Sequence, residues 1–252
     1  MPKKEINLIA RYAAALFITV YFAMADAAPF KVYSPIVEGG VTEIEYSGFR
    51  DFDRRNEVNH SQTHKLAIGR GFTDNWASEV YVEFEKEGDE TLKVESYEWE
   101  NRFQFAPQGR YWADTGLLVE YEHPAQSGDP GMLTLSPLIE KELAPRLIAT
   151  LNLGFSYQMG TNAAPGTTFS YAARLKYNLD PRFEPALEFF GEPGRISHFP
   201  ATSEQPHWIG PAFYGKVKLG QGHALVYSAA ALFATTAAAS DKRAVLRVEY
   251  EF

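Results

Sequence analysis

Alternating apolar and polar residues recur along most of this chain, and the clearest run is residues 242–252. Its apolar face carries Ala244, Leu246, Val248, Tyr250 and Phe252, and mostly charged residues occupy the other face. Successive side chains of a β-strand point to opposite sides, so a period of two predicts a strand. The same period, without the 3.6-residue period of a helix, appears in residues 76–85, 97–105, 115–122, 147–158, 169–179 and 225–233.

Five weaker stretches fill the gaps between these strands and bring the expected number to twelve. They are residues 37–48, 63–71, 132–143, 183–190 and 208–219. Three of them contain a proline: Pro137, Pro185 and Pro211. Proline cannot donate a ladder hydrogen bond and is usually confined to edges or bulges, so these three strands are the weakest part of the prediction.

The connections between the expected strands alternate between long and short. The long ones are residues 49–62, 86–91, 123–131, 160–167, 191–207 and 235–241, and the short ones are 73–75, 106–110, 144–146, 180–182 and 220–223. An even-stranded antiparallel barrel in an outer membrane has this asymmetry, with long extracellular loops and short periplasmic turns. We therefore predict an all-β, closed transmembrane barrel. The alternative, a soluble β-sandwich, does not predict this rhythm.

Aromatic residues gather beside the short turns, as expected for a girdle at the membrane–water interface. They are Phe72, Trp76, Phe103, Phe105, Trp112, Tyr177, Phe183 and Phe252.

The first 27 residues have the form of a secretory signal peptide. Lys3, Lys4 and Arg11 precede or flank an apolar stretch at 12–24, and residues 25–27 read Ala-Asp-Ala, a small-x-small cleavage site. A membrane anchor is the alternative, but about 13 apolar residues fall short of the roughly 20 needed to span a bilayer. We expect residues 1–27 to be removed and residues 28–252 to form one barrel domain.

Composition limits the chemistry of the exported chain. The full chain has a formal charge of −8, and removing residues 1–27 makes it −9. A net negative charge argues against nucleic acid as a partner, because phosphate binding needs a basic surface. The chain has no cysteine, which excludes disulfides and thiolate metal sites. We expect no metal and no cofactor.

The end of the chain, V-E-Y-E-F, resembles the C-terminal assembly signal of Gram-negative outer-membrane β-barrel proteins, with Tyr250 and Phe252 as its aromatic positions. Residues 38–48, E-G-G-V-T-E-I-E-Y-S-G, and residues 76–84, W-A-S-E-V-Y-V-E-F, are similar to small proteobacterial porin-like or transporter-like barrels without an assigned substrate. The resemblance implies contact with outer-membrane lipid and lipopolysaccharide, and binding to the barrel-assembly machinery through the C-terminal strand.

Fifteen acidic and eight basic residues fall on the inward face of the expected strands. The candidate lumen-lining residues are Glu83, Glu98, Glu100, Arg102, Glu120, Glu122, Arg174, Lys176 and Arg247. Acids dominate the N-terminal half and most bases lie in the C-terminal half, so the two arcs should face each other. Such charges must be paired or wet. Either ion pairs across the lumen close the barrel, or the charges line a water-filled channel.

These patterns favour a passive channel or transporter-like barrel for small polar or cationic solutes, because carboxylate rings favour cations. One alternative is a plugged structural barrel, or one that acts in adhesion through its outer loops. The other is a lipid-modifying enzyme, for which His60, Ser61 and His64 are the only local candidates. His60 and Ser61 are adjacent in an expected loop, so we assign no catalytic residue and expect that the protein is not an enzyme. Glu-x-Glu pairs have the spacing of a glycosidase acid and base, but a polar barrel wall explains them better.

Overall fold

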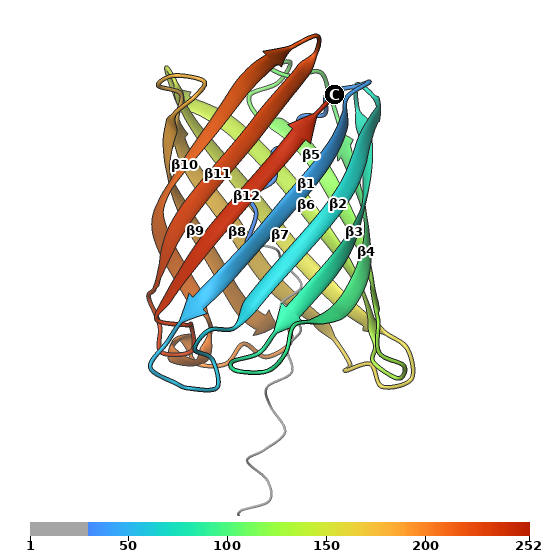
Figure 1. Cartoon of the computed structure of the whole chain (residues 1–252), viewed down its shortest axis with the longest axis vertical. Coiled ribbons are helices and arrows are strands. Elements are labelled where there is room, and N and C mark those ends of the chain that lie inside the picture. The colour runs from blue at the N-terminus through green and yellow to red at the C-terminus, as the bar shows by residue number, and fades with distance from the viewer. Residues whose placement is uncertain (1–29) are drawn as a thin grey trace, which may run out of the picture.

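The computed structural model describes residues 30–252, which form one closed antiparallel β-barrel (Figure 1). Each strand pairs with its neighbours in the chain, and the last strand pairs with the first. The strands are β1 Thr42–Phe52, β2 Gln62–Thr73, β3 Trp76–Lys86, β4 Lys93–Gln104, β5 Asp114–Pro124, β6 Gly131–Ala144, β7 Leu147–Met159, β8 Thr167–Tyr177, β9 Glu184–Arg195, β10 His207–Gly220, β11 His223–Ala234 and β12 Lys242–Glu251. One 3₁₀ turn, η1 Thr202–Glu204, lies between β9 and β10.

The predicted fold class and the number of twelve strands are confirmed. Most boundaries agree within a few residues, but β1 begins at Thr42 rather than at residue 37, and β4 begins at Lys93 rather than at 97. The expected signal peptide, residues 1–27, lies outside the described residues. Within residues 30–252, no helix is long and apolar enough to cross a membrane.

The strands that contain proline are accommodated because each proline sits where the ladder is interrupted on one side. Pro137 is in register with Leu117 of β5 but has no partner on β7. Pro211 is in register with Leu187 of β9 but has no partner on β11. Pro185 pairs with β10 beyond the last β8–β9 pair. The missing N–H therefore costs no bond in a continuous ladder.

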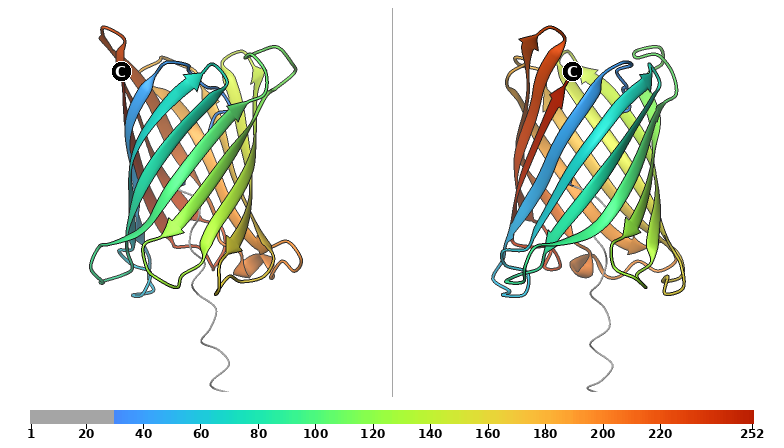
Figure 2. Two further views of the ribbon diagram at one scale, coloured as in Figure 1. Left: turned by 90° about the vertical axis from the view of Figure 1, so that its right-hand side faces the viewer. Right: turned by 45° about the vertical axis from the view of Figure 1, so that its right-hand side comes forward.

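The connections emerge alternately at two rims (Figure 2). The turn end carries the C-terminus, the start of β1 and connections 74–75, 105–113, 145–146, 178–183 and 221–222. The loop end carries connections 53–61, 87–92, 125–130, 160–166, 196–206 and 235–241. The prediction of a short turn after β4 was wrong, because residues 105–113 form a longer connection than 87–92.

The outward face of the barrel is apolar, as lipid contact requires. Residues such as Ile68, Val80, Trp99 and Leu246 lie on it with about half of their surface exposed. All eight aromatic residues expected beside the turns are exposed, including the stacked pair Phe72 and Trp76. The inward face carries most of the buried charged residues.

The barrel closes between β1 and β12 over ten residue pairs, from Glu43 with Glu251 to Phe52 with Lys242. At the turn end, the N–H of Thr42 donates to the carbonyl of Phe252 at 2.9 Å, and the N–H of Phe252 donates back at 2.8 Å. The expected closing strand therefore seals the wall up to residue 252. Its role as an assembly signal stays a prediction.

Residues 30–41, which we call the N-terminal segment, lie inside the barrel rather than in its wall (Figure 1). The segment starts from β1 at the turn end, where Gly40 donates a backbone hydrogen bond to Gly71. It reaches Phe30, which packs against Trp208 at the loop end of β10. The expected barrel domain, residues 28–252, therefore contains an internal segment, residues 30–41, followed by the twelve strands of the wall.

Candidate functional site: the occluded barrel interior

The structure places all nine candidate lumen residues on the inner wall, at different depths of burial. Glu83, Glu98, Glu100, Glu120, Arg174 and Arg247 are buried, and Arg102, Glu122 and Lys176 are partly exposed. This placement follows from the strand period, because every second residue of a barrel strand faces the interior.

The acidic arc on β2–β5 is partly compensated by bases from the same arc. Lys65 of β2 is buried, and its Nζ lies 2.6 Å from Glu98 Oε2 and 3.1 Å from Glu83 Oε2. Arg102 of β4 lies 3.7 Å from Glu79 of β3. Each of these pairs joins strands that are adjacent or separated by one strand, so the bridges run along the wall.

The bases of the C-terminal half, the basic arc, pair with acids of their own half of the barrel. Arg174 of β8 lies 3.5 Å from Glu140 of β6, and Arg247 of β12 lies 3.3 Å from Glu188 of β9. Lys176 forms an ion pair with Glu184. Among residues 30–252, no ion pair joins Glu98, Glu100 or Glu120 to Arg174, Lys176 or Arg247. The lumen is therefore not closed by bridges between the two arcs.

The N-terminal segment occupies the space between the arcs and is held by wall side chains. The backbone N–H of Tyr33 donates to Asn152 Oδ1 at 2.8 Å, and Asn152 Nδ2 donates to the carbonyl of Tyr33 at 2.9 Å. The N–H of Val37 donates to Gln104 Oε1 at 2.9 Å. These bonds replace the strand partners that an isolated extended segment lacks, so burial of its backbone is tolerated.

An aromatic cluster fixes the loop end of the segment. The ring of Phe30 lies 4.9–5.3 Å from the rings of Phe49, Phe190 and Trp208. The guanidinium of Arg243 lies 3.8 Å from the centre of the Phe30 ring, within the range of a cation–π contact. Burying a Phe side chain contributes about 1.5–3 kcal/mol, so Phe30 is the main apolar anchor.

One small cavity lies between the segment and the wall. A cavity of about 40 Å³ is lined on the segment side by Tyr33 and on the wall side by Glu120, Asn152, Gly154 and Ser170, among others. One water needs about 10–15 Å³ by this kind of measure, so the cavity holds a few waters at most.

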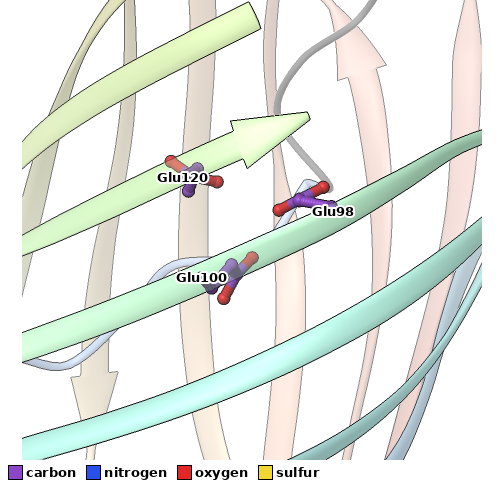
Figure 3. A group of neighbouring side chains, drawn as sticks. All are labelled: Glu98, Glu100 and Glu120. Carbon is purple, nitrogen blue, oxygen red and sulfur yellow. The ribbon is translucent and has the colours of Figure 1, made fainter. Parts of the chain in front are cut away.

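Three carboxylates meet at one point of the acidic arc (Figure 3). Glu98 and Glu100 project from β4 and Glu120 from β5, and one oxygen of each lies within 4.8 Å of the others. Glu100 Oε1 accepts a hydrogen bond of 2.6 Å from the hydroxyl of Tyr33, in the N-terminal segment. We call this cluster the acidic triad. The period of two predicted that the three residues share one wall, and no metal was expected there.

The N-terminal segment is the part of the barrel interior that the sequence pattern did not predict. Its residues Phe30, Val32, Tyr33, Pro35 and Val37 are buried. The available signal was an apolar stretch between the signal peptide and the first strong strand, interrupted by Pro35. Such a stretch is too short for a helix and too irregular for a strand.

The histidines do not form a nucleophile–base pair. His60 lies in loop 53–61 with a positive φ of 70°, and the Oγ of Ser61 accepts from the N–H of Gly88 at 2.9 Å. His64 Nδ1 is 2.8 Å from the hydroxyl of Tyr46. In the part of the chain that the structure describes, neither histidine is hydrogen-bonded to Ser61.

Taken together, the closed twelve-stranded wall, the apolar exterior and the charged interior define the fold of an outer-membrane porin-like barrel. No family model matches the chain, and no curated protein matches it. Solved structures do. The KdgM porin is similar with a TM-score of 0.56 at 9% identity, over 83% of this chain and 99% of that chain.

Two further solved barrels are similar to this chain. The NanC porin has a TM-score of 0.54 at 7% identity, over 83% of this chain and 98% of that chain. The translocator domain of the autotransporter NalP from Neisseria meningitidis has a TM-score of 0.56 at 10% identity, over 98% of this chain and 95% of that chain. At these identities the likeness concerns the fold alone.

Proposed function

We propose that this protein is a passive outer-membrane channel for small polar or cationic solutes, closed in the described state by its N-terminal segment. The observation that carries the proposal is the position of residues 30–41, which fill the lumen without belonging to the wall. The strands pair into a complete cylinder from Thr42 to Phe252. Removing the segment would therefore leave the wall intact and a polar path through it.

The charge of the wall supports cations as the preferred solutes. Glu45, Glu79, Glu83, Glu98 and Glu100 are all buried on the first four strands, where Lys65 is the buried base. A lumen lined by a surplus of carboxylates attracts cations and repels anions. Lys31 of the segment already places its ammonium next to Glu45, as a permeating cation would.

Conductance in planar bilayers tests the proposal. The purified full-length mature protein should give rare and small openings, whereas a variant lacking residues 30–40 should give stable stepwise currents. The matched control deletes residues 161–165, most of which are exposed in the loop between β7 and β8, and should behave like the parent. Both deletion variants should still migrate differently on gels with and without boiling, as a folded barrel does.

A structural or adhesion barrel is the second candidate, and the small residual cavity favours it. If the segment never leaves the lumen, about 40 Å³ of free space passes no solute. The deletion separates the two functions. Absence of current from the folded deletion variant at every voltage would overturn the channel and leave a barrel that acts through its loops.

A further inference from the structure

The acidic triad lies on the inner wall where β4 and β5 pair, and its three carboxylates crowd together. Glu100 and Glu120 are directly opposite each other in the β4–β5 register. Like charges in directly opposite positions destabilise a sheet, and burial makes the cost larger because little solvent screens them. A positive charge at the centre of the triad would stabilise it by offsetting this repulsion.

We propose that Glu98, Glu100 and Glu120 form a binding site for one divalent cation, with Ca²⁺ as its best-fitting occupant. The site goes beyond the channel function, because it concerns a ligand of the wall and not the permeating solute.

An unsatisfied carboxylate oxygen is the first independent argument. Glu120 is only 7% exposed and borders the small cavity beside the N-terminal segment. Glu98 is 4% exposed, and its Oε1 is buried without a hydrogen-bond partner. Buried carboxylate oxygens are nearly always hydrogen-bonded, paired or bound to a metal. Glu98 Oε1 is therefore an acceptor of the triad that is available to a cation.

The balance of charge is the second argument. The ionised triad carries three negative charges, and Lys65 is the one described base within ion-pair distance of it, at Glu98. Lys65 is also shared with Glu83, and the hydroxyl of Tyr33 brings no charge. Lys31 lines the same cavity as Glu120 but forms its ion pair with Glu45, so the ionised triad keeps an excess of negative charge, which a divalent cation would neutralise.

The geometry favours calcium among divalent cations. Ca²⁺ takes six to eight oxygen ligands at about 2.3–2.6 Å in a flexible arrangement, part of which three carboxylates can supply. The triad oxygens lie within 4.8 Å of one another. Mg²⁺ needs a tighter and more regular shell, and the absence of nitrogen or sulfur donors disfavours zinc. The cavity that borders Glu120 has room for the waters that complete the shell.

Calcium binding to the purified barrel in detergent tests the inference. After treatment with EDTA, calorimetric titration should show about one Ca²⁺ per chain, and Ca²⁺ should raise the unfolding temperature. Glu120→Gln should weaken binding more than tenfold, since even outer-shell substitutions cost about 10–100-fold in metal affinity. The same variant should unfold at a higher temperature than the parent in EDTA, because it removes like-charge repulsion.

Two controls keep the result specific. Glu142→Gln changes an exposed carboxylate at the turn end and should bind Ca²⁺ like the parent. NaCl at matched ionic strength should not reproduce the thermal shift.

Failure of the parent to bind Ca²⁺ at millimolar concentration would overturn the site and leave shared protons as the neutralising charge. An unchanged affinity in Glu120→Gln would overturn it equally. Neither outcome depends on conductance, so the channel proposal is tested separately.

Discussion

Asn152 holds both backbone polar groups of a single residue in the N-terminal segment. It accepts from the N–H of Tyr33 and donates to the carbonyl of the same residue. A side-chain amide is suited to this contact because it carries a donor and an acceptor side by side. Asn152 therefore fixes the depth of the segment in the lumen.

Asn152→Ala should release the segment without opening the wall. Two buried backbone groups would lose their partners, at a cost of about 1–3 kcal/mol for each unsatisfied group. Hydrogen exchange measured by mass spectrometry should become faster in residues 30–41 and stay unchanged in the strands. Asn162→Ala, which removes a bond between two exposed loops, is the matched control. Equal protection of residues 30–41 in parent and variant would show that Asn152 is not the clamp.

Asp53 organises the contact between loops 53–61 and 235–241. Its carboxylate accepts from Arg55 Nε at 2.9 Å and Nη2 at 2.8 Å, and from the backbone N–H of Asp241 at 2.9 Å. The hydrogen bonds from the Arg55 side chain hold the pKa of Asp53 well below its ordinary value, although burial acts in the opposite direction.

The contact between these two loops should therefore weaken in acid. A depressed pKa means that the stabilisation is complete above the unfolded value, about 3.9 for Asp, and is lost as the pH falls below it. Limited proteolysis by pepsin should cut loop 53–61 progressively faster below about pH 4. Asp53→Asn should be cut quickly throughout that range, whereas Asp129→Asn, in loop 125–130, should follow the parent. A parent loop with no pH dependence would contradict the assignment.

At the scale of elements, the strands were predictable because the period of two is a local property of the sequence. The inward or outward direction of each side chain follows from the same period. For that reason Glu98 and Glu100 could be placed on the inner wall before their partners were known. The period of two could not show that the strands tolerate Pro137, Pro185 and Pro211. Each proline is tolerated because the hydrogen-bond ladder to one neighbouring strand is interrupted there, and that interruption depends on the register between strands.

The N-terminal segment was not predictable by the same reasoning. Its hydrogen bonds go to side chains 67 to 119 residues away along the chain, at Gln104, Glu100 and Asn152. No local pattern encodes such contacts. The pairing of the charges was equally hidden, because Lys65 reaches Glu98 across an intervening strand.

A charge on the outer face of the closing strand should prevent membrane insertion. Leu246 lies in β12 with 48% of its surface exposed. Arg on a lipid-facing strand costs about 2–4 kcal/mol at the middle of the bilayer, so Leu246→Arg should fold poorly into lipid vesicles. The yield of the heat-modifiable band on gels measures this. Ala237→Arg, exposed in loop 235–241, should fold like the parent, and equal yields for both variants would argue against lipid contact at Leu246.

At the scale of the whole molecule, the interior has two sides. The N-terminal strands form an acidic side, and on the C-terminal strands bases such as Arg174 and Arg247 are paired with Glu140 and Glu188. The sequence predicted both arcs and left open whether ion pairs join them across the lumen or whether their charges line a water-filled channel. In the folded chain Lys65 pairs with Glu98 on the acidic side and Arg247 with Glu188 on the other side, and the N-terminal segment lies between the two sides. The surplus of carboxylates on β1–β5 therefore persists as a property of the lumen.

The barrel without residues 30–40 should conduct cations in preference to anions. The reversal potential in a KCl gradient should give a severalfold preference for K⁺ over Cl⁻ that declines at high salt, because salt screens the wall charges. Replacing Glu98, Glu100 and Glu120 by Gln in that background should reduce the preference, and replacing the exposed Glu142 should not. Anion preference in the deletion variant would contradict the role assigned to the acidic arc.

The N-terminal segment is joined directly to the first residue of the wall, and this makes it a tethered competitor. A short tether keeps the effective concentration of a bound group in the millimolar range. Any free molecule that binds Glu45, Glu100 or Asn152 must displace the N-terminal segment, which is present at this high effective concentration. It must be present at high concentration, or it must bind these residues more tightly than the N-terminal segment does.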